Sequence, residues 1–303
     1  EAEAEAAEDA ASSSSSDADV EAMRLIPSYP FPAEFHLEFQ GSRIEAVRHL
    51  CQRHPAGTRA VVLFFPGVHG GVGPCRQPGE TFDDAALYAT VARGLASRPD
   101  ADVDCYRCSW PYMRPRMNYA IGGACRMLHH ALLEAAQGSD PEDGHRDIQV
   151  VLVGHSLGGA VAVQAAEVMA RHFGTDGTGG QQMEGLQNAL VRVTGVCMLN
   201  GALDVRQVQG SDPFASLSSS RALLVCGDAD QVVPPETTAR LFEALPLKNK
   251  RHLVLPGGSH DLFTFKDQLV SELTSFITEG MDCRADAAPG SAPPEHGPRA
   301  GEG

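Results

Sequence analysis

Residues 148–159 read IQVVLVGHSLGG, a largely apolar run that leads directly into a glycine-rich segment. The run at 148–153 predicts a buried strand, and the pattern G-x-S-x-G follows it with Ser156 at its centre. Glycines two residues on either side of the serine allow neighbouring backbone segments to pass close to it, on a sharp turn between a strand and a helix. The N–H groups and the dipole at the start of that helix favour a developing oxyanion. The segment therefore predicts that Ser156 is an activated nucleophile.

A nucleophilic serine needs a carboxylate that orients its base, and a later loop supplies one. Residues 221–226 (RALLVC) predict a buried strand, and the loop 227–234 (GDADQVVP) follows it. We expect Asp230 to be this acid. Asp228 is the alternative, because it lies two residues closer to the end of the strand.

The base that the serine needs is expected near the end of the chain. Residues 252–255 predict the last strand, and PGGSH follows at 256–260. His260 is the expected base, and a helix is expected from Asp261 onward. The stretches of sequence between Ser156, Asp230 and His260 are long enough to hold further helices and strands. The three side chains can therefore meet at one edge of a sheet.

The rest of the chain alternates between strand-like and helix-like patterns. This alternation predicts an α/β fold with a mostly parallel sheet, whose site-forming loops lie at the carboxyl ends of the strands. The expected elements are a hairpin over 35–39 and 44–49, strands over 61–65, 103–108 and 193–199, and helices over 85–97, 117–136 and from the nucleophile to about 173.

The motifs GHSLGG, GDADQVVP and GGSH, in this order, resemble those of the α/β-hydrolase superfamily, over a span from about Phe35 to about Thr278. The resemblance implies a doubly wound, mostly parallel sheet that is flanked by helices. It also implies that Ser156, Asp230 and His260 form a catalytic triad.

The segment 61–71 (VVLFFPGVHGG) resembles the oxyanion loop after the third strand of that superfamily. Many relatives carry His-Gly where this chain has Pro66-Gly67. If this pair is the equivalent one, the N–H groups of Val68 and Leu157 form the oxyanion hole. If the later His-Gly pair is the equivalent, Gly71 is the donor instead. We expect Val68, because the equivalent pair normally follows the apolar run at once.

These motifs together predict a serine hydrolase that cleaves a carboxylic ester or a thioester. His260 takes the proton from Ser156 as the serine oxygen attacks a carbonyl carbon, and then returns it to the leaving group, while Asp230 sets the imidazole tautomer. Water then releases the acyl group. The alternatives are an acyltransferase or hydroxynitrile lyase on the same triad, and a non-catalytic ligand receptor or scaffold. Haloalkane and epoxide chemistry is excluded, because those relatives carry aspartate in place of the serine.

The loop 109–116 (SWPYMRPR) follows a predicted strand and should emerge on the catalytic side of the sheet. Trp110, Tyr112 and Met113 are expected to wall an acyl pocket, and Arg114 or Arg116 to pair with a carboxylate or phosphate on the substrate. The equal alternative is that the aromatic rings pack the loop onto the sheet while the arginines are solvated. Only 200–220 separate two predicted strands, which is too short for a helical lid, so we expect an open site.

Composition bounds the class of protein. The chain has 303 residues, of which 43% are apolar, and this is ample for one globular enzyme domain. Its net charge of −15 is concentrated at the ends, since residues 1–21 hold eight acids and no base. The mildly acidic body argues against nucleic-acid binding.

No apolar run of 18 residues and no secretory signal is evident, so we expect a soluble protein, in a plastid, a mitochondrion or the cytoplasm. The sequence leaves its oligomeric state open.

The expected domain organisation is a hydrolase domain over 25–280 between two disordered tails, 1–24 and 281–303. The first tail is acidic and serine-rich, and the second is rich in Ala, Pro and Gly. Glu-Ala repeats can be left by a yeast secretion leader, and an Ala/Ser-rich start can be the remnant of an organelle-targeting segment. Both origins stay open.

No metal or cofactor is expected. The glycines at 70–80 lack the Lys-Ser or Lys-Thr of a phosphate loop, so they fit the oxyanion turn better. Cys105 and Cys108 should lie on opposite faces of a strand, and His129 and His130 do not share a helix face. The eight cysteines show no disulfide spacing and are expected to be reduced core residues.

Overall fold

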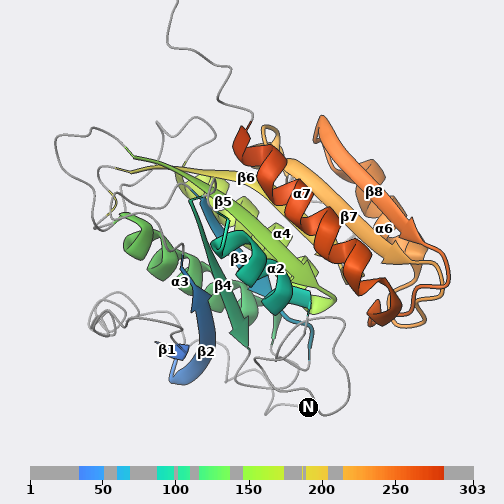
Figure 1. Cartoon of the computed structure of the whole chain (residues 1–303), viewed down its shortest axis with the longest axis horizontal. Coiled ribbons are helices and arrows are strands. Elements are labelled where there is room, and N and C mark those ends of the chain that lie inside the picture. Colours follow the sequence, from blue (N-terminus) through green and yellow to red (C-terminus); the bar gives the residue numbers. More distant parts are fainter. Residues whose placement is uncertain are drawn as a thin grey trace, which may run out of the picture.

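Apolar strands build one mixed sheet in this computed structural model (Figure 1). The structure describes residues 34–50, 60–68, 87–98, 102–109, 116–136, 146–173, 186, 189–203 and 214–282. Within these ranges the sheet has eight strands in the order β1-β2-β4-β3-β5-β6-β7-β8. The strands are β1 (Glu34–Phe39), β2 (Ser42–His49), β3 (Ala60–Phe65), β4 (Val103–Ser109), β5 (Arg146–His155), β6 (Ala189–Leu199), β7 (Arg221–Gly227) and β8 (Asn249–Leu255).

The sheet is antiparallel at one end and parallel elsewhere. β1 and β2 form a hairpin, whose two turn residues Gln40 and Gly41 have φ values of 48° and 72°, and two successive positive φ angles suit the twist of such a turn. β2 also pairs antiparallel with β4, and all later pairs are parallel. The central strand β3 is AVVLFF and is buried along its whole length, as expected for a parallel strand that is covered on both faces.

Helices cover both faces of the sheet (Figure 1). α3, α4 and α6 pack on one face, and α2 and α7 pack on the other. None of the described helices is long and apolar enough to cross a membrane. The helices are α2 (Leu87–Ala96), α3 (Met117–Ala136), α4 (Leu157–Phe173), α6 (Pro235–Ala244) and α7 (Lys266–Asp282), with short 3-10 turns at Ala215–Leu217 and Phe263–Phe265.

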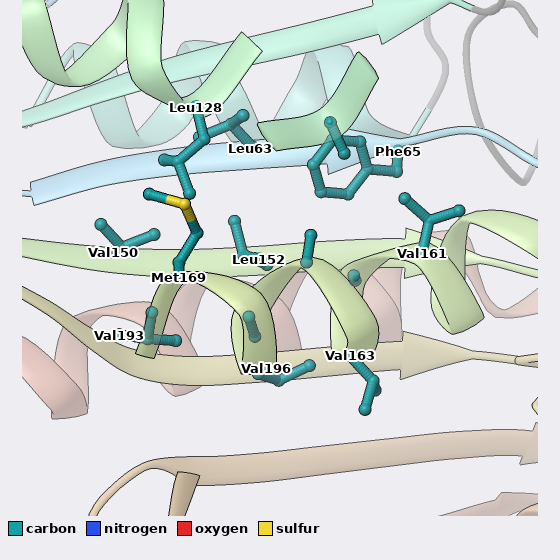
Figure 2. Packing of buried hydrophobic residues seen from close by; sticks show 14 of the residues in the cluster. Leu63, Phe65, Leu128, Val150, Leu152, Val161, Val163, Met169, Val193 and Val196 are labelled. Atoms are coloured by element: carbon teal, nitrogen blue, oxygen red, sulfur yellow. The ribbon is translucent and has the colours of Figure 1, made fainter. Parts of the chain in front are cut away.

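Alternating side chains on the strands divide the core into two layers. On β5, Val150 and Leu152 point to the layer under α3 and α4, whereas Val151 and Val153 point to the layer under α2 and α7. Figure 2 shows the first layer, in which Met169 of α4 reaches toward the strand side chains. Close packing of this layer fixes the place of α4 on the sheet, and therefore the place of the turn that precedes it.

The predicted fold class is confirmed by this architecture. The helix over 117–136 begins and ends where the sequence predicts, and the N-terminal hairpin is present. β6 begins at Ala189, four residues before the predicted start. Arg192 extends that strand by pairing with Asp147 on β5, which a search for apolar runs does not detect.

Three C-terminal boundaries differ from the predictions. β8 begins at Asn249 instead of 252, because its first residues are the polar and charged ones of an edge strand. The helix predicted from Asp261 onward begins only at Lys266. Leu262 has a φ of 54° in the left-handed region, and a 3-10 turn intervenes before the helix. α7 then continues to Asp282, two residues past the predicted domain boundary.

The predicted reduced cysteines agree with the structure where it describes them. Cys105, Cys108, Cys125, Cys197 and Cys226 are free thiols, and all but Cys125 are buried. Cys105 and Cys108 lie in opposite core layers. Burial raises the pKa of Cys125 and of Cys226 to about 11, so these thiols stay protonated at neutral pH.

The strand order reverses direction between β3 and β5. From β3 the chain moves to β4 on one side, then crosses back to β5 on the other side and continues outward to β8. In open α/β sheets, ligands bind outside the carboxyl ends of the strands at such a reversal. The segments after Phe65 and His155 lie at this edge, where the sequence motifs predict the site.

Candidate active site

Ser156 occupies the tight turn between β5 and α4. Its φ is 55°, a left-handed conformation that is uncommon for residues other than glycine and that clusters at functional sites. Its N–H donates to the carbonyl of Leu199, 2.9 Å away, and its own carbonyl accepts from Gly159 and Ala202, both at 3.0 Å. These backbone bonds from two elements hold the strained turn in place.

The flanking glycines are required by close backbone contacts. A Cβ placed on Gly154 would lie 1.9 Å from the carbonyl oxygen of Gly158, and a Cβ on Gly158 would lie 2.3 Å from the carbonyl oxygen of Phe65. No side chain fits in either place. The first turn of α4 therefore rests directly on the ends of β3 and β5, which brings Ser156 to the reversal point of the sheet.

His260 and Asp230 are hydrogen-bonded to each other. Nδ1 of His260 lies 2.8 Å from Oδ2 of Asp230, whose side chain is completely buried. The other carboxylate oxygen accepts the N–H groups of Val232 and Val233, at 2.8 and 2.9 Å. Because an ionised carboxylate only accepts hydrogen bonds, neutral His260 carries its proton on Nδ1 and keeps a lone pair on Nε2. This is the tautomer that a general base needs.

Asp228, the alternative acid, lies elsewhere. Its side chain accepts the N–H of Gly257 at 2.5 Å, which ties the loop after β7 to the loop after β8. The residue is exposed, whereas Asp230 is buried. Of the two aspartates, the structure brings Asp230 to His260.

The loop after β3 lies against the serine turn. A Cβ placed on Gly67 would lie 3.4 Å from both Cβ of Ser156 and Nδ1 of His155, so Val68 follows directly after the point of contact. Leu157 is the first residue of α4, where backbone N–H groups have no partner within the helix. Both expected oxyanion donors therefore belong to segments that adjoin the serine. The alternative register through Gly71 falls outside the described residues.

The expected substrate-binding residues Trp110, Tyr112 and Arg114 fall outside the described residues, which resume at Arg116 just before α3. The middle of the segment between β6 and β7, at 204–213, also lies outside them. Of the expected tails, 1–24 and 281–303, the structure describes only residues 281 and 282, which end α7.

Two residues that sequence reasoning left without a role lie beside this site. His155 donates through Nε2 to the carbonyl oxygen of His260 at 2.8 Å, and the two rings lie 4.9 Å apart. Asn200 is completely buried and donates to the carbonyls of Ser259 and His260, at 3.0 and 2.9 Å. The sequence holds one sign of a role for Asn200, which is its position as a polar residue immediately after an apolar strand at the catalytic edge.

Burial sets the protonation state of His155. Desolvation lowers its pKa to about 4, and the nearby His260 acts in the same direction, while the bond to the carbonyl of His260 opposes the shift. His155 is therefore neutral at pH 7. Since a carbonyl only accepts, the proton of this neutral ring lies on Nε2.

Within the residues that the structure describes, no group of three or more His, Cys, Asp and Glu side chains is placed to hold a metal ion. The groups at this edge of the sheet are a serine hydroxyl on a strained turn, an imidazole that is oriented by a buried carboxylate, and backbone N–H groups beside the serine. Such a set can carry out acyl transfer through a covalent intermediate.

Neither protein-family models nor curated protein sequences match this chain. Solved structures do. Est1E from Butyrivibrio proteoclasticus is 12% identical over 82% of this chain and 98% of that one, with a TM-score of 0.55. A protein of unknown function from Agrobacterium tumefaciens, described as an α/β hydrolase, is 15% identical over 83% and 97%, also with a TM-score of 0.55.

A third similar structure is esterase 2 from Thermogutta terrifontis, phosphoramylated by tabun. It is 16% identical over 84% of this chain and 96% of that one, with a TM-score of 0.52. At these identities the likeness concerns the fold. The order of the strands, the tight turn after β5 and these neighbours agree, and the protein therefore has the α/β-hydrolase fold.

Proposed function

We propose that this protein is a serine hydrolase that cleaves a carboxylic ester or a thioester through an acyl-enzyme on Ser156. The observation that carries the proposal is the 2.8 Å bond between His260 and the buried carboxylate of Asp230, close to a serine that is held in a left-handed turn. A buried carboxylate that orients an imidazole beside a serine enables the imidazole to act as a general base for that serine.

In the proposed reaction, Nε2 of His260 accepts the proton of the Ser156 hydroxyl as Oγ bonds to the substrate carbonyl carbon. The N–H groups of Val68 and Leu157 stabilise the negative oxygen of the tetrahedral intermediate. When the intermediate collapses, His260 gives its proton to the departing alcohol or thiol. A water molecule, deprotonated by the same imidazole, then attacks the acyl-enzyme and regenerates the serine.

Asp230 contributes by fixing Nδ1 as the protonated nitrogen and by stabilising the imidazolium that forms during each proton transfer. Its second oxygen is held by two backbone N–H groups, so the carboxylate has a single orientation toward the ring. For the substrate we propose a small ester or thioester, with Trp110 and Tyr112 as walls of the acyl site and Arg114 as a partner for a substrate anion.

Two of the similar structures carry ligands or adducts that fit this proposal. Est1E was also solved with ferulic acid bound, at 13% identity over 82% of this chain and 99% of that one, with a TM-score of 0.54. The Thermogutta terrifontis esterase was solved as a phosphoramylated adduct. These facts belong to those proteins, and they support an ester-cleaving role here only through the shared fold.

The test is hydrolysis of a nitrophenyl ester series from acetate to palmitate, with acyl thioesters in parallel, by the wild-type chain and by Ser156→Ala. We expect saturable turnover that the substitution abolishes, and covalent labelling of the wild type alone by a fluorophosphonate. Turnover that rises on adding an alcohol or thiol acceptor would identify an acyltransferase instead. No turnover and no labelling of the folded wild type would overturn the proposal in favour of a ligand receptor or scaffold.

A further inference from the structure

The segment that follows β6 contacts both the serine turn and the histidine loop. Leu199 accepts the N–H of Ser156 at 2.9 Å, and the N–H of Ala202 donates back to the carbonyl of Ser156 at 3.0 Å. Between them, the backbone of Asn200 turns with a φ of 45°, and its N–H donates to Val225 of β7 at 2.8 Å. The Asn200 side chain lies against the end of β7 and the loop after β8.

Both the oxygen and the nitrogen of the Asn200 side-chain amide form hydrogen bonds. Its Oδ1 accepts the N–H of Gly227 at 2.9 Å, and its Nδ2 donates to the carbonyls of Ser259 at 3.0 Å and of His260 at 2.9 Å. The chemistry of these partners determines how the amide is oriented, because an oxygen must face the N–H and an NH₂ must face the two carbonyls. The residue is completely buried, so water does not replace any of these bonds.

The carbonyl of His260 receives a second donor from the residue before the nucleophile. Nε2 of His155 lies 2.8 Å from this oxygen, and the His155 ring packs against the His260 ring with centroids 4.9 Å apart. Nδ1 of His155 faces the loop after β3, close to Gly67. The loops of the nucleophile, of the base and of the expected oxyanion hole therefore meet on this one imidazole.

From these contacts we propose that Asn200 and His155 are positioning residues, which together hold the backbone carbonyl of His260 and thereby aim its imidazole at Ser156. The inference rests on the proposed function. It assigns a use to two buried polar side chains that take no part in the proton transfers of the proposed reaction. Rotation about the backbone of His260 would break both bonds to its carbonyl, so the two donors restrict the ring to the orientation in which it meets Asp230.

The isosteric variant Asn200→Asp is the sharpest test. It keeps an oxygen toward Gly227 but places the second oxygen against the two carbonyls, where it repels them. We expect kcat for nitrophenyl acetate to fall by about ten- to a hundred-fold, because small misplacements of a catalytic group cost rates of this order, while KM stays near the wild-type value. Asn200→Ala removes the amide donors and also the oxygen that accepts the Gly227 N–H, but it places no repelling oxygen against the two carbonyls. Its kcat is therefore expected to lie between that of Asn200→Asp and that of the wild type.

For His155 the comparison is between His155→Gln and His155→Leu. Glutamine can donate to the carbonyl of His260 and should retain most of the wild-type kcat, whereas leucine fills similar space without a donor and should not. Rescue by the conservative variant distinguishes positioning from space filling.

A matched control separates positioning from general loss of stability. Ser220 is buried and directly precedes β7, at the opposite end of that strand from the catalytic edge, and its hydroxyl donates to the carbonyl of Val193 on β6 at 2.6 Å. Ser220→Ala removes a buried bond from a side chain to a carbonyl, as the Asn200 variants do. It should lower the melting temperature without changing kcat. All assays are run at a temperature at which melting curves show each variant to be folded.

A second readout does not depend on turnover. The Nδ1 proton of His260, assigned by its loss in His260→Gln, should give a downfield proton resonance in the full chain. We expect Asn200→Asp and His155→Leu to shift or broaden this resonance, and Ser220→Ala to leave it unchanged. If the wild type neither turns over esters nor labels with a fluorophosphonate, the proposed function fails, and this resonance still tests the positioning.

A folded Asn200→Asp protein with the wild-type kcat and an unchanged His260 resonance would overturn the inference. The same result in a protein of lowered stability would show that the bonds serve only the stability of the loop.

Discussion

At the scale of single residues, the candidate site separates two aspartates that differ little in sequence. Asp230 and Asp228 lie in one short loop, yet only the first has a buried carboxylate that meets His260. The second holds the N–H of Gly257 at the surface. The difference comes from the backbone, since the two N–H groups after Asp230 turn its carboxylate inward.

We therefore predict opposite outcomes for two matched substitutions. Asp230→Asn should lower kcat on a nitrophenyl ester by roughly a thousand-fold or more, because the amide favours the wrong imidazole tautomer. Asp228→Asn should leave kcat near the wild-type value, although the loop it ties to β8 should become less stable. Steady-state kinetics on both variants decide the matter, and a larger loss from Asp228→Asn would reassign the acid.

The three candidate catalytic residues could be predicted from the sequence, because each follows a recognisable apolar strand and two lie within glycine-rich motifs. Asn200 could not be assigned in this way. Its three side-chain bonds go to backbone groups at the end of β7 and in the loop after β8, and the positions of these groups depend on tertiary packing that one sequence does not display.

At the scale of elements, the first turn of α4 is pressed against the end of β3. The carbonyl of Phe65 occupies the place that a side chain on Gly158 would need. α2 offers the contrast, because a Cβ on its exposed Gly94 would meet nothing within 4 Å. The same residue type thus has a packing role in one helix and none in the other.

Alanine substitutions at these two glycines should change stability in opposite directions. Gly158→Ala forces backbone atoms apart and should destabilise the protein by about 3 kcal/mol or more. Gly94→Ala should stabilise it by about 0.5–1 kcal/mol, because alanine restricts the unfolded chain and favours the helix. Urea unfolding of both variants provides the measurement. Equal effects would mean that α4 does not rest on β3 as described.

Element boundaries were predicted well where burial produces a periodic pattern, as in α3, and less well at the edge of the sheet. β8 begins with Asn249, Lys250 and Arg251, whose polarity hides a strand from any search for apolar runs. α7 begins late because Leu262 adopts a left-handed conformation, which nothing in its residue type indicates.

At the scale of the whole molecule, one buried and two partly buried histidines make stability depend on pH. Burial lowers the pKa of His130, His155 and His252 from the ordinary value of 6.5, to about 4 for His155. The unfolded chain therefore binds more protons than the folded one as the pH falls from 6.5 toward 4. The stabilisation is complete above pH 6.5 and is lost progressively through this window.

We predict that the free energy of unfolding falls between pH 6.5 and 4, with His155 alone contributing roughly 3 kcal/mol of the loss. Denaturant unfolding across this range measures the slope. His155→Gln cannot take up the proton, so its slope should be shallower than that of the wild type. Parallel curves for the two proteins would show that His155 does not titrate in this window.

The strand order also has a consequence for synthesis on the ribosome. β3 is apolar along its whole length and needs β4 on one side and β5 on the other, but β5 begins only at Arg146. Until that strand leaves the exit tunnel, a growing chain has one long edge of β3 without a hydrogen-bonding neighbour. Sheets that join such distant strands form slowly, so we expect the nascent chain to need shielding by chaperones until β5 is available.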